Sequence, residues 1–149
     1  MYKRQELETV TTAGQYFVTQ EQLPDTTGPF VAQCTSGPLT PLYGWTGPDS
    51  LSSTVHTLAD SVRELHYPAP NERTVRRDEA LTVDGHAGWV YEFDLSWDVA
   101  GYDATGERAA LVLVDVGKPQ PALVYLSLPN THAELYGAID RVVGDIDVL

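Results

Sequence analysis

The sequence has only one cysteine, Cys34, among its 149 residues. An intramolecular disulfide is therefore excluded, and so is a zinc site with two or more thiolate ligands. Basic residues are also few: nine Lys and Arg stand against 21 Asp and Glu, which gives a formal net charge of -12. Nucleic acids and anionic lipid surfaces require a basic face, so the composition argues against both as partners.

Motifs for catalysis are missing as well. The sequence contains no GxSxG, HExxH, GxGxxG or GxxxxGK motif. The four histidines have no paired ligand spacing, and the neighbours of Cys34 are neither basic nor histidine, so nothing local activates its thiol. We therefore predict a protein that is not an enzyme and has no cofactor. A hydrolase that combines Cys34 or a serine with a distant histidine is the third alternative.

The beginning of the chain is treated separately. No apolar run approaches the ~20 residues that cross a bilayer, and the first residues do not form a signal peptide. Met1 to Gln5 resemble translated sequencing-adapter sequence, so we expect the true N-terminus, with any upstream anchor, to be missing. Residues 6–50 read as an extended, turn-rich part with two short β-prone runs, 15–20 and 29–35.

Residues 51–149 predict an α+β core, which together with the first part makes a single domain over residues 1–149. Apolar side chains recur at helical spacing in residues 50–66, the pattern of an amphipathic helix. Residues 73–128 read as an antiparallel meander, in which Asp84-Gly85 is a typical two-residue hairpin turn. RAALVLVDV, at residues 108–116, is apolar almost throughout and suits a central strand.

The last predicted element is a second amphipathic helix. Thr131 and Glu134 have the spacing of a capping box at its start, and Gly144 is a suitable C-cap. The residues after Gly144 could add one short strand. The fold class is therefore α+β, an antiparallel sheet packed against two amphipathic helices. The predicted core consists of Leu51, Val55, Leu58, Val62, Trp89, Tyr91, Phe93, Leu111, Leu113, Val124, Leu126, Leu135, Ile139 and Val142.

Acidic residues supply one candidate metal site. Asp98, Asp103 and Glu107 fall in one predicted loop together with two glycines. Calcium takes several oxygen ligands from such a loop, so weak Ca²⁺ binding is one interpretation. The alternative is a solvated hairpin loop, because acids readily occupy turns.

Two further groups are weak candidates for binding. Arg73, Arg76 and Arg77 could bind an anion, or could balance the neighbouring carboxylates across an exposed strand. Tyr43 and Trp45 could line a groove, or could pack a long loop against the domain.

Three turn motifs connect the chain to a known group of proteins. They are Val83-Asp84-Gly85 before an aromatic strand, Asp115 and Gly117 after a hydrophobic strand, and Ser127-Leu128-Pro129 before the last helix. With the order of elements over residues 51–149, they resemble the PsbP-like sandwich of actinobacterial secreted or membrane-anchored proteins, which include LpqN-type lipoproteins. The resemblance implies a sheet wrapped by helices and a location outside the cytoplasm at the cell envelope. It carries over no functional residue.

These observations together favour a non-catalytic extracytoplasmic accessory or interaction domain of a bacterial envelope protein. Its partner would be a protein at the cell envelope, and membrane attachment would come only from a missing upstream anchor. The alternative is a binding module for a small molecule or an ion, either Ca²⁺ or an anion.

Overall fold

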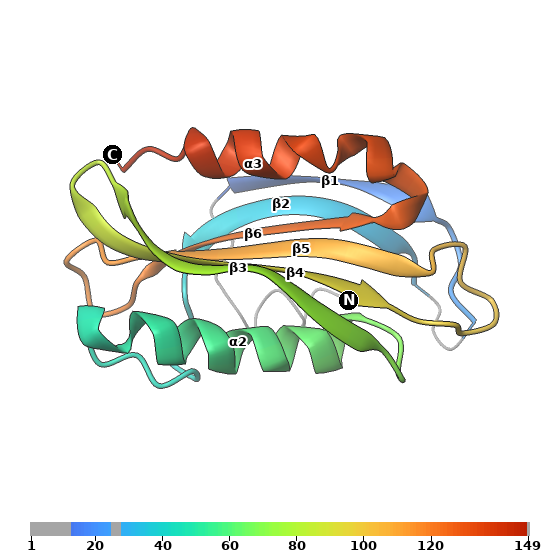
Figure 1. Ribbon diagram of the computed structural model, residues 1–149, viewed down its shortest axis with the longest axis horizontal. Helices are drawn as coiled ribbons and strands as arrows, with labels where there is room; N and C mark the ends of the chain where they lie inside the picture. Colours follow the sequence, from blue (N-terminus) through green and yellow to red (C-terminus); the bar gives the residue numbers. More distant parts are fainter. Residues whose placement is uncertain (1–12, 25–27, 149) are drawn as a thin grey trace.

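A six-stranded antiparallel sheet lies between two helices in the computed structural model, which describes residues 13–24 and 28–148 (Figure 1). The strands are β1 (Ala13–Gln20), β2 (Phe30–Pro38), β3 (Glu72–Val83), β4 (His86–Ser96), β5 (Gly106–Val114) and β6 (Ala122–Pro129). The helices are α2 (Leu51–His66) and α3 (Gly137–Gly144), preceded by the 3-10 turns η1 (Pro48–Ser50) and η2 (Asn130–Leu135). The α+β class predicted from the sequence is therefore confirmed.

The strand order across the sheet is β1-β2-β6-β5-β4-β3. Strands β3 to β6 form the predicted meander, and α2 carries the chain from β2 to the opposite edge of the sheet, where β3 begins. The hairpin at Asp84-Gly85 is confirmed: both residues have positive φ, 50° and 81°, as a tight turn between twisted strands requires.

The turn-rich N-terminal part contributes to the same sheet. Its two β-prone runs fall within β1 and β2, and β2 pairs with β6 in antiparallel register, with Cys34 opposite Leu126. Strands β1 and β2 are therefore part of the same sheet as the α+β core. The proposed artefact at Met1 to Gln5 lies outside the described residues.

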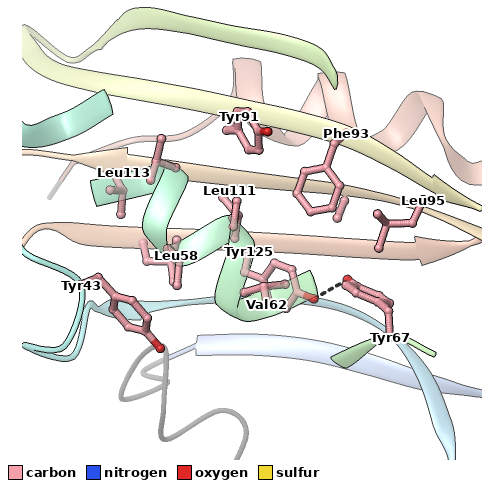
Figure 2. Close-up of a cluster of buried hydrophobic side chains, with 14 of the residues drawn as sticks. Tyr43, Leu58, Val62, Tyr67, Tyr91, Phe93, Leu95, Leu111, Leu113 and Tyr125 are labelled. Carbon is pink, nitrogen blue, oxygen red and sulfur yellow. Dashed lines mark hydrogen bonds between the residues drawn. The ribbon is translucent and has the colours of Figure 1, made fainter. Parts of the chain in front are cut away.

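Helix α2 covers one face of the sheet with the predicted apolar stripe. Leu51, Val55, Leu58 and Val62 are buried, whereas Leu65 at the end of the stripe is exposed. Figure 2 shows this core, in which Leu58 and Val62 meet side chains from three strands. The strand residues labelled there are Tyr91, Phe93, Leu95, Leu111, Leu113 and Tyr125.

Helix α3 lies on the opposite face and forms a second, smaller core (Figure 1). Ile139 and Val143 are its buried residues. They belong to a cluster with strand residues Val90, Ala110, Val112 and Leu126. Strand β5 sends alternate side chains into both cores, which is the physical reason for its nearly unbroken apolar sequence.

The capping box predicted at Thr131 and Glu134 is wrong. Residues 130–135 form a 3-10 turn that is broken at His132 (φ -125°, ψ 38°), and the Thr131 hydroxyl contacts the ring of His132. Helix α3 begins only at Gly137, so Leu135 is exposed and does not join the core. No strand follows within residues 145–148; the Val148 amide donates to Asp84 instead.

The rest of the predicted core is confirmed with three qualifications. Trp89, Val124 and Val142 are half-buried, and the indole N–H of Trp89 donates to Asp78 at 2.7 Å. Trp89 therefore packs at the margin of the α2 core, whereas Phe93 of the same strand is fully buried.

Replacing Phe93 by alanine should lower the free energy of unfolding by about 3–5 kcal/mol, because the substitution leaves a cavity in a closed core. Urea denaturation would measure the change. Leu42→Ala is the control, since Leu42 is 63% exposed and its truncation removes little packing. Equal, small effects of both substitutions would contradict the position of Phe93.

Candidate functional site

The predicted acidic site is not assembled in the structure. Asp98 and Asp103 are exposed in the loop after β4, but Glu107 is the second residue of β5 and is buried. Its carboxylate faces the α2 core, where it accepts a hydrogen bond from Ser127. Among the described residues, no group of three His, Cys, Asp or Glu side chains could hold a metal ion. The assignment of Glu107 to the loop was therefore wrong.

The three arginines do not form a common anion site. Each is engaged by a different carboxylate of the α2 or strand surface. The nearest N–O distances are 2.8 Å for Arg73–Asp60, 3.4 Å for Arg76–Asp94 and 3.6 Å for Arg77–Glu79. This arrangement corresponds to the charge-balancing alternative, in which paired charges lie on an exposed edge strand.

The positions of Tyr43 and Trp45 correspond to the second interpretation, in which they pack a long loop against the domain. Tyr43 is buried in the α2 core (Figure 2). Trp45 is half-buried against the same core. The loop between β2 and α2 therefore packs on the sheet, and these two rings do not line an open groove.

An open apolar groove lies instead on the α3 side of the sheet. Helix α3 has eight residues and runs along the strands, so it covers only part of the width of the six-stranded sheet (Figure 1). The cluster around its buried residues is formed mainly by β4, β5 and β6, with Cys34 of β2 at its margin, and among the described residues it includes none from β1. We call the resulting depression the α3-side groove.

The α3-side groove has two parts that share Gly14, Gln15, Cys34 and Val142. The first part encloses about 940 Å³ and the second about 680 Å³. Apolar lining residues of the first part include Val114, Val116, Val124 and Ile146. Those of the second part include Phe17, Ala32, Leu126, Leu128 and Leu135. Among the described residues that line the groove, charge is confined to Lys118 and Asp147.

Cys34 lies where the two parts of the groove meet. It is half-buried on β2, and burial raises the pKa of its thiol above the ordinary value of 9.0. His56 is hydrogen-bonded to Asp78, His86 to the Asp115 carbonyl and His132 to Thr131, so these three histidines are engaged elsewhere. The cysteine therefore lacks the lowered pKa that a nucleophile requires.

A buried polar network lies on the other face, between the sheet and the end of α2. The Tyr67 hydroxyl is 2.5 Å from the Tyr125 hydroxyl and 2.8 Å from Ser127 Oγ (Figure 2). Ser127 in turn donates to Glu107 Oε1, so its oxygen accepts from Tyr67, and Tyr67 accepts from Tyr125. This chain of donors leads from β6 to β5 through Tyr67, which directly follows α2.

Burial raises the pKa of Glu107 well above its ordinary value of 4.5, and the weaker effect of the Ser127 hydrogen bond only partly opposes this. Its second oxygen, Oε2, has no hydrogen-bond partner among the described residues. A protonated carboxyl is the form that such an environment favours, because an isolated buried charge is costly. Desolvation also raises the pKa of Tyr67, which keeps this phenol neutral.

A second polar cluster lies at the α3 side of β4 and β5. Arg108 donates to both oxygens of Asp94, at 2.7 and 3.0 Å, and its guanidinium lies 4.5 Å from the ring centre of Tyr136. Burial, with the carboxylate of Asp94, raises the pKa of Tyr136 to about 12. These groups satisfy one another and offer no free charge to a ligand.

The sequence reasoning did not find the α3-side groove. Val124 and Val142, which line this groove, were predicted to be core residues. The available signal was that one short helix follows the last strand, since a single helix that runs along the strands covers only part of a six-stranded face (Figure 1). The capping-box prediction, which placed the start of this helix at Thr131, concealed it.

Comparison with known proteins shows the fold alone. No family model matches the chain, and no curated protein matches it. A crystal structure of PA94 from Pseudomonas aeruginosa, a protein of unknown function for which a regulatory role is suggested, is similar with a TM-score of 0.52. The match covers 92% of this chain and 83% of that chain at 14% sequence identity. At this identity the likeness indicates a shared arrangement of helices and strands.

Replacing Glu107 by glutamine should change the pH dependence of stability. A raised folded-state pKa means that the folded chain keeps a proton that the unfolded chain loses above about pH 4.5. The contribution of Glu107 to stability is therefore complete below that pH and is lost as the pH rises towards the folded-state pKa. Glu107→Gln removes this loss, so the variant should gain stability relative to the parent over the pH range above about pH 5.

Urea denaturation of both proteins across this pH range measures the difference. Glu134→Gln is the matched control, because Glu134 is an exposed carboxylate on η2. A constant difference between Glu107→Gln and the parent at all pH values would show that Glu107 does not retain its proton in the folded chain.

Cys34 should react slowly with iodoacetamide in the folded protein. Burial raises the pKa of the thiol and thus lowers the thiolate fraction at neutral pH. Mass spectrometry of folded and urea-unfolded protein at the same pH compares the two rates, and the folded protein should be alkylated more slowly. Faster alkylation of the folded protein would reveal an activated thiol and would revive the hydrolase alternative.

Proposed function

We propose that this protein is a non-catalytic interaction domain that binds an apolar segment of a partner in the α3-side groove. The observation that supports this proposal is an apolar groove beside α3, where charge is confined to Lys118 and Asp147 among the described lining residues. Soluble domains rarely leave large apolar surfaces open unless a partner covers them. The two parts of the groove are joined at Cys34 and Val142, so a single elongated guest fits better than two separate ones.

The proposal includes a location at the cell envelope and a PsbP-like fold. The turns that carry this resemblance have the geometry of fold-forming turns: Gly117 has a φ of 74°, and its amide donates to the Asp115 carboxylate at 3.1 Å. Within the described residues, neither helix has the length and apolarity needed to cross a bilayer. An upstream lipoprotein signal or anchor in the complete gene would support the envelope location, and a cytosolic enzyme domain there would oppose it.

A small-molecule binding module is the second candidate function. The larger part of the groove, about 940 Å³, has the volume of a pocket for a drug-sized ligand. An apolar small molecule would use the same side chains as a peptide segment. The ion-binding alternative has less support, because the described carboxylates form no cluster of three ligands.

The groove should bind the neutral fluorescent probe N-phenyl-1-naphthylamine, and Val142→Lys should weaken that binding at least about tenfold, since it places a charge among apolar side chains. Val142 suits the test because it is half-buried on α3 and lines both parts of the groove. Fluorescence titration of the folded protein gives the dissociation constant. Displacement by an uncharged, leucine-rich peptide would favour the peptide segment over the small molecule.

Leu42→Lys is the control variant, because Leu42 is an exposed apolar residue of the loop that leads to α2 and lies outside the groove lining. It should leave probe binding unchanged. If the probe bound all three proteins with equal affinity, the α3-side groove would not be its site and the proposed function would fail.

A further inference from the structure

The two edge strands of the sheet differ sharply in charge. Strand β3 forms one edge and carries charged side chains at Glu72, Arg73, Arg76, Arg77, Asp78 and Glu79. Strand β1 forms the other edge, and its sequence AGQYFVTQ contains no charged residue. An edge strand exposes a row of unpaired N–H and C=O groups, and charged side chains are a common means of preventing further pairing. Only the β3 edge is protected in this way.

Strand β1 also exposes three consecutive large apolar side chains. Tyr16, Phe17 and Val18 are 63%, 42% and 41% exposed. Since side chains alternate along a strand, these residues lie on both faces of the sheet at its edge. Phe17 is on the α3 side, because it lines the groove, contacts the ring of His132 and pairs with Ala32 of β2.

From these observations we propose that two copies of the chain associate through β1, in antiparallel pairing about a twofold axis. A twofold axis that pairs two equal edge strands antiparallel must run perpendicular to the sheet. It therefore joins the two sheets into one continuous sheet and places both α3 helices on the same side. Gln15 and Phe17 line the groove at this edge, so the two α3-side grooves adjoin across the axis. This inference does not depend on the proposed function of the groove.

A second copy fits this edge because it brings an equally uncharged strand with the same exposed apolar side chains. With a net charge of -12, two copies repel each other over most of their surface. Pairing of β1 with β1 juxtaposes two uncharged strands, whereas pairing through β3 would have to accommodate three acidic and three basic side chains at the interface. Screening of the remaining repulsion means that association should strengthen as the salt concentration rises. One strand pair buries a small area, so the dimer should dissociate on dilution.

Sedimentation of the full chain over a range of protein concentrations tests the proposal. The parent should pass from monomer to dimer as its concentration increases, and more readily at high salt. Val18→Lys should raise the dimer dissociation constant at least about tenfold, because it introduces like charges at the twofold interface. Val75→Lys is the matched control, since Val75 is an edge-strand valine of similar exposure, 47%, on β3.

The outcomes are distinct. A parent that remains monomeric at every concentration, or a dimer that Val18→Lys leaves intact, would overturn the proposal. A dimer that Val75→Lys disrupts would locate the interface at β3 and would equally overturn it. If the Val18→Lys variant does not fold, Tyr16→Lys replaces it in this test. Tyr16 is more exposed than Val18, so its substitution should disturb the fold less. Backbone amides of β1 that become protected from hydrogen exchange only at dimeric concentrations would establish the edge pairing itself.

Discussion

The structure depends on one constraint: its central strands are apolar on both faces, so both faces of the sheet must be covered. Strand β5 sends Leu111 and Leu113 to one side and Ala110 and Val112 to the other. The covering helices are unequal, with 16 residues in α2 and eight in α3, or ~24 Å and ~12 Å of helix. One face therefore closes into a core with an internal polar network, and the other remains partly open as the α3-side groove.

Local patterns in the sequence were sufficient for most of the fold. The hairpin at Asp84-Gly85 and the stripe of α2 are properties of neighbouring residues, and both were predicted. The position of Glu107 was not, because a carboxylate beside two glycines looks like a loop residue. Its burial depends on Ser127 and Tyr67, which approach it only when β6 pairs with β5 and the chain leaves α2.

The site could not be predicted for a related reason. The groove exists because no described element fills the space beside α3 on this face of the sheet. No residue type in the sequence indicates such an unfilled space. The candidate residues chosen from the sequence, such as Arg73 and Tyr43, have charged or aromatic side chains. In the structure Arg73 is paired with a carboxylate and Tyr43 is buried. The lining of the groove consists largely of small and branched apolar side chains, whose separate presence is typical of any core. Their common position along one groove emerges only from the sheet order and the place of α3 on the sheet.

The unequal burial of the two helices also divides the molecule into layers of different local stability. Helix α2 is held by six buried residues, whereas α3 rests on the sheet through Ile139 and Val143. Segments with few buried contacts open at lower free energy than the whole domain, so α3 can lift away while the α2 core stays intact. The wall beside the groove is thus the part of the two helical layers that costs least free energy to move, and it can move without disturbing the layer that keeps the protein folded.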